Sequence, residues 1–182
     1  LAKIKGWLRH RPGRGKLEAV PLAFFFKEMS DELPKQVARN HPLVFKPVGQ
    51  PLEDHTAWMI RESMQSSVKV LVDNAVRATQ DGPNPDKPVV IEHGICPRAG
   101  RMNMLIRVRD QGPGLSKQAS QNVLIRPYSD YESDGSMGEG LLAVKDVLQD
   151  HGGSIRHVPR QAPGAVFEIL VPLEKRSQPR EV

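Results

Sequence analysis

The sequence predicts an α+β sandwich of two layers, in which helices cover one face of a mixed β-sheet. Two observations support this fold class. The segments follow the order helix, strand, helix, hairpin, helix, loop, helix, hairpin, and the repeated strand-helix-strand alternation of a doubly wound parallel sheet is missing. A chain of 182 residues, with 38% hydrophobic and 26% charged residues, also suits one domain with its own core.

The first half is expected to form two helices around a short strand. Apolar residues four apart predict an amphipathic helix over residues 22–39, although Pro34 lies inside it. Residues 41–48 alternate as a strand does and lead into a turn sequence. No glycine or proline interrupts residues 53–79, so one long helix is expected there. Its continuous face comprises Ile60, Met64, Ser67, Leu71, Asn74 and Ala78.

The second half predicts two hairpins and two shorter helices. Glycine and proline turns separate these segments, and a region rich in serine, aspartate, glycine and tyrosine is expected to be a loop. The predicted strands are residues 89–91, 104–108, 154–158 and 165–171, the helices are residues 116–124 and 138–150, and the loop is 126–137.

The chain is expected to divide into a basic linker over residues 1–20, one domain over residues 21–173 and a disordered tail over residues 174–182. The net charge of +5 invites a nucleic-acid interpretation, but much of the excess lies in the linker. Aromatic residues make up only 5% of the chain, so few side chains could stack on bases. We therefore expect no nucleic-acid partner. The basic residues of the linker are Lys3, Lys5, Arg9, Arg11, Arg14 and Lys16.

Three features bear on cellular location. No apolar stretch is long enough to span a bilayer, and the start has no secretory leader. The single cysteine, Cys96, excludes an internal disulfide and favours a reducing, cytoplasmic setting. The first residue is Leu1 rather than Met, which suggests a piece of a longer protein whose upstream part could be an inner-membrane sensor.

A polar pair on the long helix offers the first part of a candidate site. Asn74 has apolar neighbours, so its amide is expected at the edge of the core, where a neutral oxygen suits Mg²⁺ beside phosphates and waters. Arg77 follows one turn later, where its guanidinium could hold a phosphate oxygen. Taken alone, each residue fits an ordinary helix surface better.

Two segments that contain glycine offer the rest of a nucleotide site. Asp110 ends a strand and could accept a hydrogen bond from an exocyclic amino group, while Gly112 and Gly114 would let a flat base approach. Taken alone, this segment fits an ordinary turn capped by aspartate better. Gly138 and Gly140 stand where a loop becomes a helix, so free backbone N–H groups would face an anion.

The order of these motifs resembles the GHKL nucleotide-binding fold, or Bergerat fold, of histidine kinases, type II topoisomerases, a heat-shock chaperone family and mismatch-repair ATPases. It looks most like the catalytic and ATP-binding domain of a bacterial sensor histidine kinase, over roughly residues 20–173. The matching stretches are LVDNAVR at 71–77, DQGPGL at 110–115, MGEGL at 137–141 with Val144 and Lys145, HGG at 151–153 and GAVF at 164–167.

The resemblance implies an enzyme, a protein-histidine kinase that uses ATP and Mg²⁺. It implies that Asn74 binds Mg²⁺, Arg77 a phosphate and Asp110 the adenine amino group, and that residues 116–137 form a lid over ATP. The implied partners are a histidine-bearing dimerisation domain, joined through the linker, and a response regulator. The other ATP-binding residues that it implies are Gly112, Gly114, Leu115, Tyr128, Met137, Gly138, Gly140, Leu141 and Ala165.

Four positions depart from the family pattern. Relatives that hydrolyse ATP carry a glutamate one turn before the metal-binding asparagine to activate water, whereas this chain has Val70, so hydrolysis is disfavoured. Ser136 replaces a glycine, Glu139 a leucine and Ala165 a threonine. These changes keep an alternative open, a degenerate and non-catalytic module that docks a partner or a response regulator.

The phosphoryl acceptor is expected outside this sequence. None of the 6 histidines starts a recognisable acceptor motif, and no helical hairpin precedes the domain. A hydrolysing ATPase of the topoisomerase or chaperone type is a third and weaker interpretation, because of Val70 and the short chain.

Overall fold

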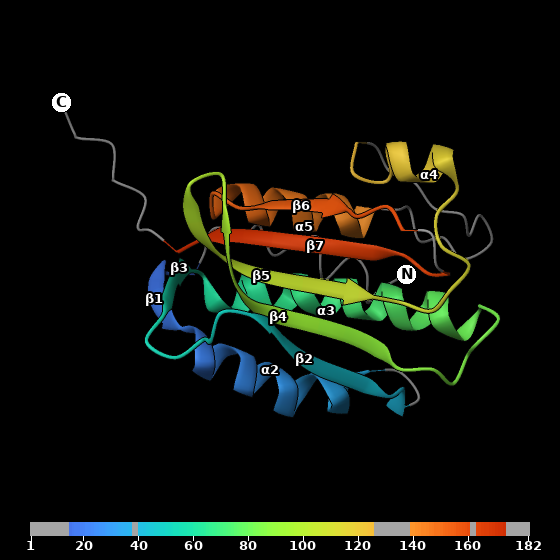
Figure 1. The fold of residues 1–182 in the computed structure, drawn as a ribbon, viewed down its shortest axis with the longest axis horizontal. Helices are drawn as coiled ribbons and strands as arrows, with labels where there is room; N and C mark the ends of the chain where they lie inside the picture. Colours follow the sequence, from blue (N-terminus) through green and yellow to red (C-terminus); the bar gives the residue numbers. More distant parts are fainter. Residues whose placement is uncertain (1–14, 38–39, 126–138, 161–162, 174–182) are drawn as a thin grey trace.

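The computed structural model describes residues 15–37, 40–125, 139–160 and 163–173, and in them helices pack on one side of a β-sheet (Figure 1). The elements in chain order are β1 (Glu18–Pro21), α2 (Leu22–Gln36), β2 (Leu43–Gly49), β3 (Thr56–Met59), α3 (Arg61–Gln80), β4 (Val89–Arg98), β5 (Arg101–Arg109), α4 (Lys117–Asn122), α5 (Glu139–Asp150), β6 (Ser154–His157) and β7 (Val166–Pro172).

The main sheet has five strands in the order β2-β4-β5-β7-β6. β2 runs parallel to β4, and the other neighbours are antiparallel, so the sheet is mixed as the sequence predicts. β4 and β5 form a hairpin whose turn residues, Ala99 and Gly100, have φ angles of 50° and 72°. The second predicted hairpin is also present, as β6 and β7. The α+β fold class is confirmed.

The hydrophobic core lies between the sheet and α2, α3 and α5. In Figure 1 α3 and α5 run behind the strands, and Phe26 of α2 stacks on His93 of β4 with ring centroids 4.6 Å apart. Strand residues therefore alternate between a face toward the helices and an open face. Fully buried core side chains include Phe25, Met64, Ile91, Ile106, Leu148 and Ile169.

The long helix expected over residues 53–79 is wrong at its start, because α3 begins only at Arg61. The preceding residues form β3, which pairs antiparallel with β1. The β3 segment Thr56–Met59 is rich in strand-forming side chains, and burial alternates along part of it. An absence of glycine and proline therefore permits a helix without requiring one. Part of the predicted linker, residues 18–20, belongs to β1.

The predicted face of α3 also shifts near its end. The buried stripe runs through Val68, Val72, Ala75 and Thr79, while Asn74 is exposed. Asn74 consequently lies beside the core, at its edge, rather than on the buried face itself. Within the described residues, no helix combines the length and the hydropathy needed to cross a bilayer.

Candidate nucleotide site

Asp110 follows β5 directly and is 5% exposed. Its Oδ1 atom accepts hydrogen bonds from the backbone N–H groups of Gly112 and Ala165, both at 2.9 Å. The N–H of Asp110 donates in turn to the carbonyl oxygen of Ala165 at 3.1 Å. Among the described residues, the hydrogen bonds to this carboxylate end on Oδ1, so Oδ2 keeps its capacity to accept one from a ligand.

Burial shifts the pKa of the Asp110 carboxyl group. It raises the pKa of Asp110 above the ordinary 3.8, and the two backbone donors and the positive charges of Arg160 and His157 offset this effect only in part. Within the described residues no lysine or arginine forms an ion pair with Asp110. An N–H donor from a ligand would therefore add a partner that the protein itself does not supply.

The turn after Asp110 packs tightly against the end of α3. The N–H of Gln111 donates to Oγ1 of Thr79 at 3.0 Å, and that hydroxyl donates to the carbonyl of Ala75 at 2.8 Å. A Cβ atom on Gly112 would lie 2.5 Å from the carbonyl oxygen of Ala78. The side of Gly112 where a Cβ atom would lie thus faces α3. The immediate role of this glycine is to let the turn approach α3 rather than to admit a flat base.

Two further glycines hold this turn against the start of β7. Gly114 and Gly164 have φ angles of 82° and 90°, which side chains rarely allow. A Cβ atom on Gly164 would lie 2.2 Å from the carbonyl oxygen of Asp110. Gly164 is therefore needed for the position of Asp110.

Asn74 lies between two contacts along one row of α3. Val70, Asn74 and Ala78 are each one turn apart and share a side of the helix. Gly112 approaches Ala78, and a Cβ atom on Gly140 of α5 would lie 3.3 Å from Cγ1 of Val70. The exposed Asn74 amide is therefore flanked by the Asp110 turn on one side and by the first turn of α5 on the other.

The remaining predicted site residues fall into three groups. Arg77 is exposed in the last turn of α3. Leu115 packs partly buried against the core, while Leu141 and Ala165 are buried. Tyr128, Met137 and Gly138 lie outside the described residues, as does Ser136.

The sequence alone did not reveal the side chains that hold α4. Oγ of Ser120 and Nδ1 of His157 are 2.8 Å apart, which ties α4 to β6. Nζ of Lys145 donates to the carbonyl of Leu124 at 2.8 Å, which ties the end of the same segment to α5. Burial lowers the pKa of His157, against the opposing charge of Asp110. No local pattern could have revealed these partners, since 37 and 21 residues separate them.

His151 connects the end of α5 to the start of α3. Its Nε2 accepts the N–H of Ile60 at 2.8 Å, and its Nδ1 is 2.6 Å from the carbonyl of Val147. These partners require a proton on Nδ1 and a lone pair on Nε2. The sequence placed His151 at a helix end, and the structure adds that it fixes the relative position of the two helices beside Asn74.

The residues around Asn74 fit a metal that arrives with a nucleotide. Among the described residues, no three His, Cys, Asp or Glu side chains gather as a metal cluster. Asn74 offers a single neutral oxygen, and Mg²⁺ commonly takes only one or two protein ligands with phosphates and waters. The donor set therefore suits Mg²⁺ bound together with a triphosphate.

Comparison with known families identifies the family of this chain. Residues 60–175 match the family model described as histidine kinase-, DNA gyrase B-, and HSP90-like ATPase. The chain belongs to this family. The match begins at Ile60, next to the first residue of α3, and takes in each motif that the sequence analysis identified. The family resemblance drawn from those motifs is confirmed.

Two individual sensor proteins are also similar to this chain. The C4-dicarboxylate transport sensor protein DctS of Rhodobacter capsulatus is 32% identical over 109 residues, which cover 60% of this chain and 16% of that protein. The sensor histidine kinase ZraS of Salmonella typhimurium is 32% identical over 80 residues, which cover 44% of this chain and 17% of that protein. The chain thus matches about a sixth of the length of these relatives.

Solved structures share the fold at low sequence identity. The catalytic domain of histidine kinase ThkA has a TM-score of 0.65 at 18% identity, with 87% of this chain and 96% of that chain covered. Full-length ShkA in complex with AMPPNP has a TM-score of 0.66 at 14% identity, with 92% of this chain and 33% of that chain covered. The fold is therefore that of histidine kinase catalytic domains.

Proposed function

We propose that this chain is the ATP-binding catalytic domain of a two-component sensor histidine kinase. It binds Mg²⁺-ATP and donates the γ-phosphoryl group to a histidine on a separate dimerisation domain, from which a response regulator receives it. The observation that carries this proposal is the position of Asn74, exposed between the Asp110 turn at Ala78 and the first turn of α5 at Val70.

Each residue then has a role set by its chemistry. Oδ2 of Asp110 accepts a hydrogen bond from the exocyclic amino group of adenine, since Oδ1 already accepts hydrogen bonds from two backbone N–H groups. Asn74 offers an oxygen to Mg²⁺, and Arg77, one turn further, balances phosphate charge. The first turn of α5, which contains Gly140, offers backbone N–H groups to the phosphates, and Gly138 is assigned to the same phosphate site. When it is bound, the metal would neutralise negative charge on the phosphates.

Val70 favours phosphoryl transfer over hydrolysis. It occupies the position one turn before Asn74, and its side chain packs against Gly140. A hydrocarbon side chain cannot take a proton from water, so a water molecule there is not activated. Phosphoryl transfer needs positioning and charge stabilisation more than a strong base on this domain.

Four of the five described histidines, all except His55, support an acceptor elsewhere. His41 is 6% exposed and lies 3.0 Å from the carbonyl of Lys87, and His151 is 8% exposed between two backbone groups. His93 stacks on Phe26, and His157 contacts Ser120. Each of these four rings has a packing or hydrogen-bonding role that an accessible nucleophile would have to give up.

Titration calorimetry with ATP, with and without Mg²⁺, tests the nucleotide site. Asp110→Asn is expected to weaken binding by about tenfold or more, because it replaces an acceptor oxygen with an amino group facing a donor. Asn74→Leu is expected to remove the dependence of binding on Mg²⁺. Asp86→Asn makes the same chemical change as the first variant on an exposed loop residue and should leave affinity unchanged. Unchanged affinity in Asp110→Asn would contradict the assignment.

A transfer assay tests the reaction class. The chain is mixed with Mg²⁺-ATP and a separately produced dimerisation domain, and phosphohistidine is measured on that domain. Release of phosphate by the chain alone at a comparable rate would contradict the role given to Val70. Absence of ATP binding would instead favour a non-catalytic docking module, for which Glu139 at the start of α5 is the observation in support, because its charge opposes a triphosphate.

A further inference from the structure

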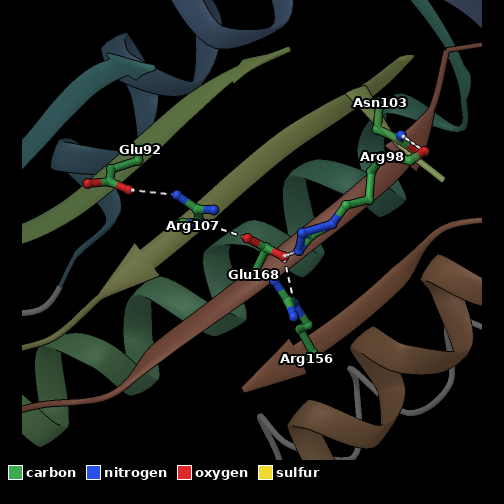
Figure 2. A network of polar contacts seen from close by, with 6 residues as sticks. All are labelled: Glu92, Arg98, Asn103, Arg107, Arg156 and Glu168. Carbon is green, nitrogen blue, oxygen red and sulfur yellow. Dashed lines mark hydrogen bonds and ion pairs between the residues drawn. The ribbon is translucent and has the colours of Figure 1, made fainter. Parts of the chain in front are cut away.

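A row of charged side chains crosses the open face of the sheet from one edge to the other. Strand register places Lys46 of β2 beside Glu92 of β4, Glu92 beside Arg107 of β5, Arg107 beside Glu168 of β7, and Glu168 beside Arg156 of β6. Cross-strand partners project on the same side, and the charge alternates at every step. Figure 2 shows the last four of these residues together with Arg98.

Glu168 is the centre of this row. It is 1% exposed, although it lies on the face without helices. Its Oε2 accepts from Nε of Arg107 at 2.7 Å, and its Oε1 accepts from Nε of Arg156 at 2.7 Å and from Nη2 of Arg98 at 3.4 Å. Arg98 extends along the sheet to reach it (Figure 2). One carboxylate therefore fixes the orientation of the guanidinium groups of Arg107 and Arg156, and it makes a longer contact with that of Arg98.

The positive charge of this face exceeds what Glu168 needs. Its two oxygens are already satisfied by Arg107 and Arg156, and the longer Arg98 contact adds little to that. The side chains of Arg98, Arg107 and Arg156 remain 44%, 35% and 52% exposed. A guanidinium has five N–H donors, so most of those on Arg98 and Arg156 can serve another group. Lys46 and Arg101 add exposed cations on the same face.

We propose that the arginine face, defined by Lys46, Arg98, Arg101, Arg107 and Arg156, is a docking surface for a partner protein that presents aspartate and glutamate side chains. Guanidinium groups bind carboxylates in a bidentate manner. Because Glu168 already orders the guanidinium groups of Arg107 and Arg156, less conformational entropy is lost on association. The face lies across the sheet from α3 (Figure 1), the helix that carries Asn74, so this docking is additional to nucleotide binding and compatible with it.

A protein fits this face better than a continuous polyanion does. The side chain of Glu92 is 17% exposed within the row and would oppose closely spaced phosphates. The ring contacts involving Phe26, Phe45 and Phe167 lie on the helix side of the sheet, so these described rings offer bases no stacking platform on the arginine face. Among the described residues the exposed large hydrophobic side chains are Leu17, Phe24, Val44 and Ile125. Register places only Val44 of these four on this face, which is too little apolar surface for insertion into a bilayer.

The test uses a labelled peptide of alternating glutamate and serine, with binding followed by fluorescence anisotropy in the absence of ATP. The face variant carries Lys46→Gln, Arg98→Gln and Arg101→Gln, and it spares Arg107 and Arg156 so that Glu168 stays paired. The control variant carries Lys16→Gln, Lys27→Gln and Lys35→Gln, which removes the same charge from exposed residues outside the main sheet. Thermal unfolding of both variants verifies that they fold.

The face variant is expected to bind the peptide about tenfold more weakly than the wild type, while the control variant stays within about twofold. Equal losses in both variants, or no binding by the wild type, would overturn the proposal, because net charge alone would then account for the result. Tighter binding to duplex DNA or to phosphatidylglycerol vesicles, lost in the same face variant, would also overturn it. Since ATP is absent, failure here leaves the proposed kinase function untouched.

Discussion

Two buried carboxylates one strand apart are held in opposite ways. Asp110 follows β5 and is 5% exposed, and Glu168 lies in the neighbouring β7 and is 1% exposed. Asp110 is bound by backbone N–H groups on a single oxygen, whereas Glu168 is bound by arginine side chains on both oxygens. Burial raises the pKa of Asp110, while at Glu168 hydrogen bonds from Arg156 and Arg107 outweigh the effect of burial and lower the pKa.

The difference separates a binding carboxylate from a structural one. A carboxylate held by the backbone on one oxygen keeps an acceptor for a ligand, and no described cation competes for it. A carboxylate enclosed by arginines has no acceptor to spare, but it orders the cations around it. Burial of an acid therefore does not indicate function by itself; the chemistry of its donors does.

The largest expected effect concerns the backbone that holds Asp110. Gly164→Ala is expected to lower the free energy of unfolding by about 3 kcal/mol or more, because it adds strain at a positive φ to a clash with the carbonyl of Asp110. Gly100→Ala has a similar φ but open space around it, and is expected to cost about 1 kcal/mol. Urea denaturation of both variants measures the difference, and equal losses would mean that the close approach to Asp110 is unimportant.

The next largest effect is the difference in stability cost between neutralising Glu168 and neutralising Asp110. Glu168→Gln is expected to cost about 2 kcal/mol of unfolding free energy, since the arginines lose their charged acceptor although water still reaches them. Asp110→Asn keeps an oxygen for both backbone donors and is expected to change stability by less than about 0.5 kcal/mol. Urea denaturation at neutral pH distinguishes the two.

Glu92→Gln provides the matched control for the arginine row. Glu92 forms a partly exposed ion pair with Arg107 at 3.6 Å, so the loss of its charge is expected to cost less than about 0.5 kcal/mol. A large cost in Asp110→Asn would show that its charge is structural. A negligible cost in Glu168→Gln would show that the buried row does not stabilise the fold, and the contrast between the two carboxylates would disappear.

Local patterns account for most of the predicted fold. Turn glycines and apolar periodicity located both hairpins, α2 and α5, because those signals act within a few residues. The pairing of β1 with β3 was missed, since residues 18–21 meet residues 56–59 only in the folded chain. Residues 56–59 were assigned to a helix because they contain no glycine or proline that would interrupt one. Tertiary pairing decided between the two conformations.

The candidate site was predictable in outline for a different reason. Asn74, Asp110 and Gly140 were found through the order of their motifs, although each alone fitted an ordinary helix or turn. Thr79, which holds the Asp110 turn, and His157, which holds α4, were missed because their hydrogen bonds join distant segments. The role of Glu168 could not be predicted for the same reason. In the sequence it is a single charged residue in an apolar strand, and only the strand register shows that arginines lie beside it.

The smallest expected effect is in the pH dependence of stability, where the two carboxylates should act with opposite sign. The raised pKa of Asp110 contributes stability that is fully present below about its ordinary value of 3.8 and is lost as pH rises through the folded-state pKa. The lowered pKa of Glu168 contributes stability that is present above its ordinary 4.5 and is lost as pH falls through the folded-state pKa. Unfolding free energies measured from about pH 3 to about pH 7 should therefore show the wild type losing stability relative to Asp110→Asn as pH rises, and gaining it relative to Glu168→Gln. If the difference in unfolding free energy between the wild type and each variant changed with pH in the same direction, the two acids would have the same kind of environment. The inference that Oδ2 of Asp110 is a free acceptor would then be contradicted.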